Sequence, residues 1–177
     1  MRITILGWKR TTLPEYCSKA EKLCFKLSKK NHTIITGGGT GIMGSSNKGA
    51  FEANKENSIG ITVDVILDEK PDVIQNILEK NYIVEKTFHE RKKKLMHDTD
   101  INIFFPGGMG TLDEFSDLIN LYKTKSIVSK PIICVGEKYY YSLMDWFSLN
   151  KIVFPKHLIS LVTDDIDLVV DKIDELS

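Results

Sequence analysis

Residues 101–114 have the sequence INIFFPGGMGTLDE, in which an apolar run leads directly into a glycine-rich loop and then into a polar stretch. The run Ile101–Phe105 shows no alternation of apolar and polar residues, which is typical of a strand buried on both faces of a sheet. The loop 106–111 then opens a predicted helix over Leu112–Tyr122. This unit of strand, glycine loop and helix is typical of an α/β protein with a parallel sheet.

The same unit occurs earlier in the chain, where residues 33–44 read TIITGGGTGIMG. Short β-branched runs alternate with longer amphipathic stretches along the rest of the sequence. The predicted strands are Ile3–Leu6, Thr33–Thr36, Ile59–Val63, Tyr82–Val84, Ile101–Phe105, Ile132–Val135 and Leu158–Val162. The predicted helices are Pro14–Lys30, the segment after the first glycine loop to about Asn54, Ile74–Glu79 after Pro71, Phe88–His97, Leu112–Tyr122, Tyr140–Leu149 and Ile166–Leu176.

Regular alternation of strands and helices implies right-handed crossovers and a parallel sheet with helices on both faces. The predicted fold class is therefore α/β, a Rossmann-like doubly wound sheet, with residues 1–177 forming a single domain. Ligands of such sheets bind beyond the carboxyl ends of the strands. Both glycine loops follow strands, so the sequence predicts one site at this edge of the sheet.

The composition excludes several classes of function. Hydrophobic residues make up 42% and charged residues 27% of 177 residues, as in an ordinary globular protein. The 24 basic and 24 acidic residues cancel, so we expect no nucleic acid or membrane partner. No apolar run is long enough to span a bilayer, and the start of the chain is typical of a strand and not of a secretory signal. We therefore expect a cytoplasmic location.

Cysteines and histidines give no sign of a metal site. The cysteines are Cys17, Cys24 and Cys134, and the histidines are His32, His89, His97 and His157. The odd number of cysteines and the absence of a CxxC motif favour buried free thiols. The histidines are scattered without an HExxH motif or a Cys/His pair, so we expect no metal site.

The first glycine loop allows two interpretations. Read from Gly39 to Gly44 it matches GxGxxG, and Asp64 lies 20 residues further on, which is the outline of a dinucleotide-binding fingerprint. That fingerprint usually follows the first strand, whereas this loop follows the second. A nicotinamide dehydrogenase is one possibility, although no catalytic partner can be identified. The other interpretation is a tight turn with close packing of helix against strand.

The second glycine loop also has two interpretations. Free backbone amides and the Thr111 hydroxyl at a helix N-terminus would suit a phosphate dianion. Glu114 stands three residues after Thr111, however, and T-x-x-E is also the pattern of a capping box in which the glutamate only binds backbone. The carboxylates of Asp113 and Asp117 could likewise do no more than complement the helix dipole.

One arginine in the basic segment 88–94, FHERKKK, is expected to have a specific role. The chain contains 21 lysines and only three arginines, and Arg91 is one of the three. Arginine offers a planar fork of donors that lysine lacks. We expect Lys92–Lys94 to be surface charges, as is usual for a charged helix.

Together, GGGTGIMG, FHERKKKLM and PGGMGTLDE, in this order and spacing, resemble the LONELY GUY family of cytokinin riboside monophosphate phosphoribohydrolases, whose members are often misnamed lysine decarboxylases. The resemblance covers nearly the whole chain. It implies a Rossmann-like homodimer that needs no cofactor. It also implies hydrolysis of the N-glycosidic bond of a purine nucleoside monophosphate, a small-molecule nucleotide, to free base and ribose 5-phosphate.

Carried over to this sequence, the resemblance implies that Arg91 and Glu114 are the catalytic residues. The implied phosphate and ribose loop consists of Gly107, Gly108, Gly110 and Thr111. The implied first binding loop contains Gly37, Gly38, Gly39, Gly41 and Gly44.

The chain departs from the family pattern in two places. The first strand is followed by Gly7-Trp8-Lys9-Arg10 where many relatives have a small Gly-Ser-Ser turn, and the family's proline after the third strand is missing near Asp64-Val65. Both departures affect the expected base specificity more than the type of reaction. A non-catalytic carrier of nucleotide or molybdenum cofactor remains the main alternative. Lysine decarboxylation is not expected, since no lysine is singled out to bind pyridoxal phosphate.

Overall fold

The computed structural model describes residues 1–9, 13–64 and 76–177 of the chain. Its strands are β1 (Arg2–Leu6), β2 (Thr33–Thr36), β3 (Ser58–Val63), β4 (Tyr82–Glu85), β5 (Ile101–Phe104), β6 (Ile132–Val135) and β7 (Ile159–Thr163). Its helices are α1 (Pro14–Lys29), α2 (Ile42–Ala53), α4 (Phe88–Met96), α5 (Met109–Lys123), α6 (Glu137–Leu149) and α7 (Ile166–Leu176), with short 3-10 turns at Lys55–Asn57, Glu79–Asn81 and Lys156–Leu158.

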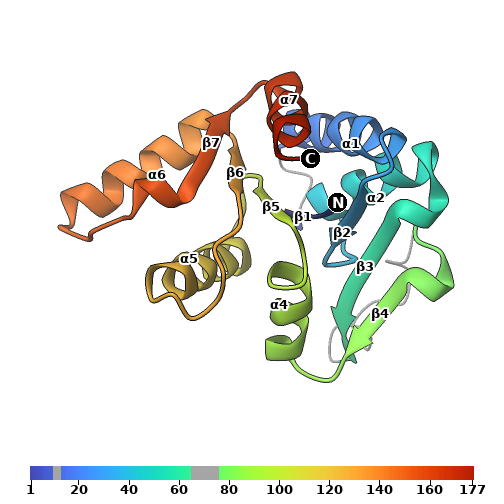
Figure 1. Ribbon diagram of the computed structural model, residues 1–177, viewed down its shortest axis with the longest axis horizontal. Helices are drawn as coiled ribbons and strands as arrows, with labels where there is room; N and C mark the ends of the chain where they lie inside the picture. Colours follow the sequence, from blue (N-terminus) through green and yellow to red (C-terminus); the bar gives the residue numbers. More distant parts are fainter. Residues whose placement is uncertain (10–12, 65–75) are drawn as a thin grey trace.

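The strands form one seven-stranded sheet in the order β4-β3-β2-β1-β5-β6-β7 (Figure 1). Every pair of neighbouring strands is parallel. From β1 the chain builds the sheet outward in one direction as far as β4, then returns and continues from β5 on the other side. The order therefore reverses between β1 and β5, which is where doubly wound sheets bind ligands.

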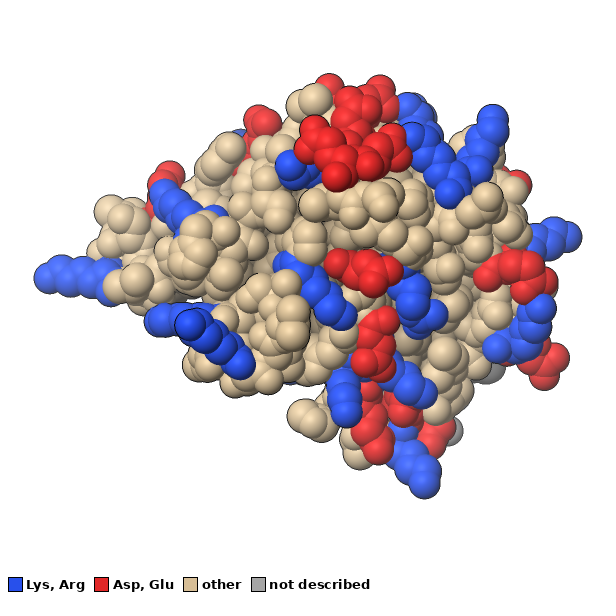
Figure 2. Space-filling model, viewed as in Figure 1, with Lys and Arg blue, Asp and Glu red and all other residues tan. Residues whose placement is uncertain are grey.

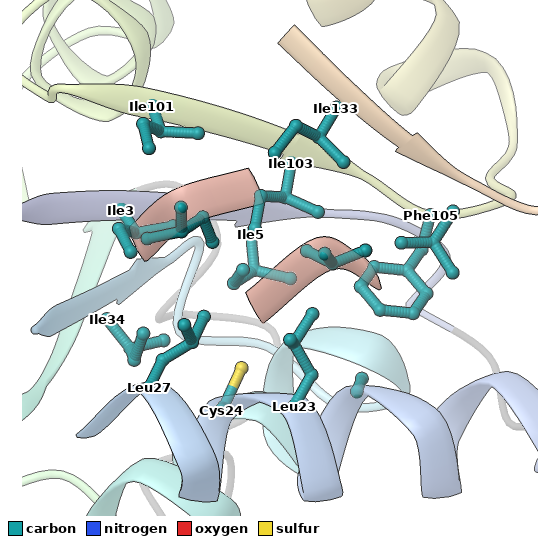
Figure 3. Packing of buried hydrophobic residues seen from close by; sticks show 14 of the residues in the cluster. Ile3, Ile5, Leu23, Cys24, Leu27, Ile34, Ile101, Ile103, Phe105 and Ile133 are labelled. Carbon is teal, nitrogen blue, oxygen red and sulfur yellow. The ribbon is translucent and has the colours of Figure 1, made fainter. Parts of the chain in front are cut away.

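Helices cover both faces of the sheet because alternate strand residues point to opposite sides. Ile3 and Ile5 of β1 pack in a cluster with residues of α1, α2 and α7, whereas Leu6 packs in a second cluster with residues of α4, α5 and α6. Figure 3 shows Leu23 and Leu27 of α1 pointing toward the first cluster. The predicted Rossmann-like doubly wound fold is therefore confirmed.

Two buried polar side chains of the central strands hold the end of α4. The Thr4 hydroxyl donates to the carbonyl of Leu95, and the Asn102 amide donates to the carbonyl of Met96 over 3.2 Å. Carbonyls at a helix C-terminus have no partner within the helix, so these bonds satisfy groups that would otherwise be buried and unpaired. They also fix the position of α4, which carries Arg91.

Most of the predicted elements are confirmed, and the differences have local causes. Helix α5 begins three residues earlier than predicted, because Gly108 takes an extended conformation as its N-cap. Helix α6 likewise begins at Glu137, after Gly136 with φ of 116°. The predicted helix over 74–79 is wrong for its described part, since Asn76 has φ of 61° and Leu78 is extended. Residues 74–75 and Pro71 lie outside the described residues.

The three cysteines are free thiols, as predicted. Cys24 and Cys134 are buried, and Cys17 is partly exposed. Burial raises the pKa of the Cys24 thiol to about 12, so this group is inert at neutral pH.

Acidic and basic side chains are interspersed over much of the face shown in Figure 2. Between α1 and α7, Lys26 pairs with Asp167 and Lys30 pairs with Asp174. In the part of the chain that the structure describes, no helix is both long enough and apolar enough to cross a membrane.

Candidate functional site

A pocket of about 290 Å³ with both polar and apolar lining residues lies at the point where the strand order reverses. Its walls come from the segment after β1, the start of α5, and one side chain each from α2 and α4. The lining residues are Gly7, Trp8, Lys9, Met43, Arg91, Gly108, Met109, Gly110, Thr111 and Glu114. The topology of the sheet thus brings the two residues implied to be catalytic into one pocket, although 23 positions separate them.

Glu114 lies in the second turn of α5, and its side chain is only 12% exposed. Its Oε1 is 3.4 Å from Nη1 of Arg91. Burial raises the pKa of the Glu114 carboxyl above its ordinary value, and the guanidinium of Arg91 opposes part of this shift. A buried carboxylate with a raised pKa that faces a pocket is a candidate general base.

The guanidinium of Arg91 is held from three sides. Its Nε donates to the carbonyl of Ile61 in β3 over 3.0 Å, and its Nη1 faces Glu114. Its Nη2 lies against Gly37, where an added Cβ would be only 2.1 Å away. Because the side chain is 13% exposed, these contacts define one orientation of the fork. The sequence-based expectation of a specific role for Arg91 fits this arrangement.

The expectation that Lys92 is only a surface charge is wrong. Its Nζ lies 2.8 Å from Asp113 and 3.5 Å from Asp117, and its side chain is 24% exposed. The two carboxylates therefore pair with a lysine on α4 and do more than complement the dipole of α5. This contact ties α4 to α5 on either side of Glu114, so it supports the geometry of the pocket. Lys94 pairs with Glu85 of β4.

The capping-box interpretation of Thr111 and Glu114 is also wrong. The N-cap of α5 is Gly108, no side chain caps this helix, and Thr111 lies within the first turn. A helix start of this kind leaves its first amides without partners inside the helix, and the residues at this start line the pocket. The loop itself is held by the Tyr139 hydroxyl, which donates to the carbonyl of Gly107 over 2.7 Å.

The first glycine loop stands mainly behind the pocket. Of its residues only Met43 lines the pocket, while Gly37, Gly38, Gly39, Gly41 and Gly44 do not, and neither does Gly107 of the second loop. Gly38 and Gly41 have φ of 68° and 65°. These conformations support the interpretation as a tight turn. Asp64 is exposed just after β3.

Sequence reasoning missed Met43 and Met109, which line the pocket, because it considered only the glycines and the polar residues of the two motifs that contain them. Trp8 and Lys9 were singled out as a departure from the family, and both line the pocket. Arg10 and Val65, from the two departures, lie outside the described residues.

Comparisons with known proteins find similar chains among curated proteins and solved structures. The chain is 27% identical over 143 residues to a probable cytokinin riboside 5'-monophosphate phosphoribohydrolase of Oryza sativa subsp. japonica. The aligned region covers 80% of this chain and 60% of that protein. The chain is 28% identical over 130 residues to a cytokinin riboside 5'-monophosphate phosphoribohydrolase of Arabidopsis thaliana, which covers 73% of this chain and 55% of that protein. The chain thus spans a little over half the length of these curated relatives.

Among solved structures, the molybdenum cofactor binding protein of Rippkaea orientalis superimposes with a TM-score of 0.71 at 18% identity, over 99% of this chain and 96% of that one. The molybdenum cofactor carrier protein of Chlamydomonas reinhardtii gives 0.69 at 22% identity over the same shares. These similarities show a common fold. A family model described as "possible lysine decarboxylase" matches residues 43–176, which include the pocket residues of α4 and α5. The chain therefore belongs to this family, which confirms its resemblance to the LONELY GUY proteins.

Proposed function

We propose that the protein hydrolyses the N-glycosidic bond of a purine nucleoside 5'-monophosphate, releasing the free base and ribose 5-phosphate. The observation that carries this proposal is the buried carboxylate of Glu114, which faces Arg91 over 3.4 Å in a pocket that also contains the N-terminus of α5. The names of the curated relatives point to the same reaction class in those proteins.

The start of α5 is suited to the phosphate group. Its first amides and the positive end of the helix dipole favour an anion, and the Thr111 hydroxyl adds a further donor. Gly110 has no atom within 4 Å of the position that a Cβ would occupy, so a ligand can approach the backbone closely there. Held in this place, the phosphate would orient the sugar toward Glu114, about one helical turn, or ~5 Å, further along α5.

The chemistry follows from the charge that develops on the sugar. As the bond from the anomeric carbon to the base nitrogen breaks, its electron pair leaves with the base, and positive charge builds up on the sugar. The Glu114 carboxylate can stabilise that charge and take a proton from the water that attacks the anomeric carbon. The water oxygen then forms the new bond to the sugar, and the proton taken by Glu114 passes to the departing base, which restores the carboxylate.

Arg91 acts in this scheme as a positioning residue. Its fork is anchored on the carbonyl of Ile61 and directs one amino group at Glu114. It keeps the carboxylate in one orientation and counteracts part of the rise in its pKa that burial causes. Lysine cannot make both contacts, so we expect the Arg91→Lys variant to retain only part of the wild-type activity.

The direct test is to incubate the protein with a panel of nucleoside 5'-monophosphates and to look for free base by chromatography. Glu114→Gln should keep the fold and the binding of nucleotide but lose most turnover, because an amide cannot take the proton. Glu175→Gln, on the exposed side of α7, is the matched control and should behave as wild type. Turnover by Glu114→Gln close to that of wild type would remove Glu114 from the mechanism.

A non-catalytic carrier is the alternative that this panel must exclude. The solved structures with the same fold include two proteins whose names describe binding or carriage of a molybdenum cofactor. Mass spectrometry of the purified protein would detect a bound pterin cofactor. Such a cofactor, together with no base released from any monophosphate, would favour the carrier.

A further inference from the structure

Trp8 follows β1 and lines the pocket. Its backbone is fixed on both sides: its amide donates to the carbonyl of Pro106 over 3.1 Å, and its carbonyl accepts from the amide of Ile42 over 3.0 Å. The next residue is also tied down, since the carbonyl of Lys9 accepts from the Thr40 hydroxyl over 2.6 Å. The segment therefore links the second glycine loop to the start of α2.

This anchoring places the indole beside the N-terminus of α5. A Cβ added to Gly108, the N-cap of that helix, would lie 3.8 Å from Nε1 of Trp8 and within 4 Å of no other atom. The half-buried indole thus borders the space where the first amides of α5 emerge. Among the described residues, this Nε1 donates no hydrogen bond. An indole N–H can only donate, so it is available to an anionic ligand.

We propose that the indole N–H of Trp8 donates a hydrogen bond to the phosphate of the bound nucleotide, alongside the amides of α5. Trp8 is then a phosphate-recognising residue of this pocket. The inference rests on the proposed function for the class of ligand. Phosphate is the group concerned because Nε1 borders the helix N-cap, whereas the carboxylate expected to face the anomeric carbon, that of Glu114, lies a turn further along.

The test compares ligands with and without phosphate. Isothermal titration is carried out with adenosine 5'-monophosphate and with adenosine, on wild type, Trp8→Phe and Trp8→Leu. Phenylalanine keeps an aromatic ring but removes the N–H. A hydrogen bond to a charged group corresponds to an affinity change of roughly 10-fold to 100-fold, so Trp8→Phe should weaken binding of the monophosphate by that factor and binding of adenosine less than about twofold.

Two results would overturn the inference. Equal weakening of both ligands, or no weakening by Trp8→Phe, would show that the N–H does not recognise phosphate. If only Trp8→Leu weakened binding, the indole would act by stacking on the base, which also contradicts the proposal. Melting temperatures of the variants within a few degrees of wild type would establish that the fold is kept.

The two tryptophans of the chain provide an independent readout. Trp146 is 53% exposed on α6 and does not line the pocket. In a Trp146→Phe variant, Trp8 is the sole indole, and adenosine 5'-monophosphate should change its fluorescence with the affinity found by titration. In Trp8→Phe the remaining Trp146 should not respond. A silent Trp8, or a response from Trp146 alone, would contradict the proposal.

Failure of the inference can be told apart from failure of the proposed function. If wild type binds the monophosphate but releases no base, the hydrolase proposal fails while the binding comparison still decides the role of Trp8. If base is released and Trp8→Phe binds the monophosphate as tightly as wild type, only the inference fails. No binding of the monophosphate by wild type would overturn the phosphate site and the role of Trp8 together.

Discussion

The two glycine loops look alike in the sequence, but glycine is needed in them for different physical reasons. In the first loop the protein's own atoms exclude side chains: a Cβ on Gly37 would be 2.1 Å from the Arg91 guanidinium, and one on Gly41 would be 2.4 Å from the carbonyl of Trp8. In the second loop, Gly110 meets nothing within 4 Å and Gly108 meets only the Trp8 indole nitrogen at 3.8 Å. The first loop is therefore shaped by packing, and these two positions of the second are open toward the pocket.

This difference teaches that a glycine motif by itself does not locate a ligand. The first loop matches the better-known nucleotide fingerprint, GxGxxG, yet its glycines serve the turn and the side chain of Arg91. The second loop lacks that fingerprint, yet it provides the helix N-terminus of the pocket. Alanine substitutions in each loop distinguish a glycine required by packing from a glycine that leaves room for a ligand.

Gly41→Ala should have the largest effect on stability. Gly41 has φ of 65° and ψ of −129°, a conformation that residues with a Cβ avoid, and the added carbon would overlap the backbone of Trp8 and Lys9. Strain and overlap together predict a loss of about 3 kcal/mol in the free energy of unfolding. Chemical denaturation would measure it. A stability equal to that of wild type would contradict the conclusion that packing requires glycine in this loop.

Gly37→Ala should act on activity more than on stability. The new methyl group would push the Arg91 guanidinium away from its place between Ile61 and Glu114. Displacement of a positioning group by about 1 Å can lower turnover about 10²-fold, and we expect a loss of that order. Base release under saturating monophosphate is the measurement, with the far-UV spectrum as control for folding. Wild-type turnover would show that the orientation of Arg91 is not required.

The pH dependence sharpens the role of the second loop's helix. Burial raises the pKa of Glu114 above the ordinary 4.5, so activity that needs the carboxylate should fall on the acid side at a pH above that value. The pKa of Glu114 is higher in the folded protein than in the unfolded chain, so folding favours the protonated carboxyl. The contribution of this group to the free energy of unfolding is therefore fully present below the ordinary pKa and is lost as the pH rises through the folded-state pKa.

Glu114→Gln cannot titrate at this position. Its free energy of unfolding should therefore increase relative to that of wild type as the pH rises through this window. Melting curves of both proteins between acid and neutral pH would measure the difference. If the stabilities of the two proteins changed with pH in parallel, a raised pKa for Glu114 would be contradicted.

Gly110→Ala should have the smallest effect on stability, and of the opposite sign. The position is helical, does not have a positive φ, and has open space around it. Replacing glycine by alanine inside a helix favours folding by roughly 0.5–1 kcal/mol. Binding of adenosine 5'-monophosphate should nevertheless weaken, since the methyl group enters the space proposed for phosphate. A variant that is more stable and binds equally well would place the ligand elsewhere.

Much of this molecule follows from local patterns in the sequence. Apolar runs such as Ile101–Phe105 predicted the buried central strands, and the alternation of strands and helices predicted a parallel sheet covered on both faces. The motif residues Arg91, Thr111 and Glu114 were identified on sequence grounds, and the fold brings all three to one pocket. The strands and the sheet depend on short-range periodicity and chain chirality, which a single sequence contains, whereas the roles of the motif residues were implied by the resemblance to a family.

Other features depended on contacts between residues far apart in the chain. Glu114 was equally compatible with a capping box, and the partner that distinguishes the two cases, Arg91, lies on a different helix. Lys92 pairs with Asp113 across two helices, and no local pattern specifies that pairing. The reason why each loop position is glycine likewise depends on neighbours from elsewhere in the chain. The sequence by itself determined which elements form and which residue types gather at one edge of the sheet. Only the tertiary structure decided their partners and burial, because desolvation and ion pairing arise where separate elements pack together.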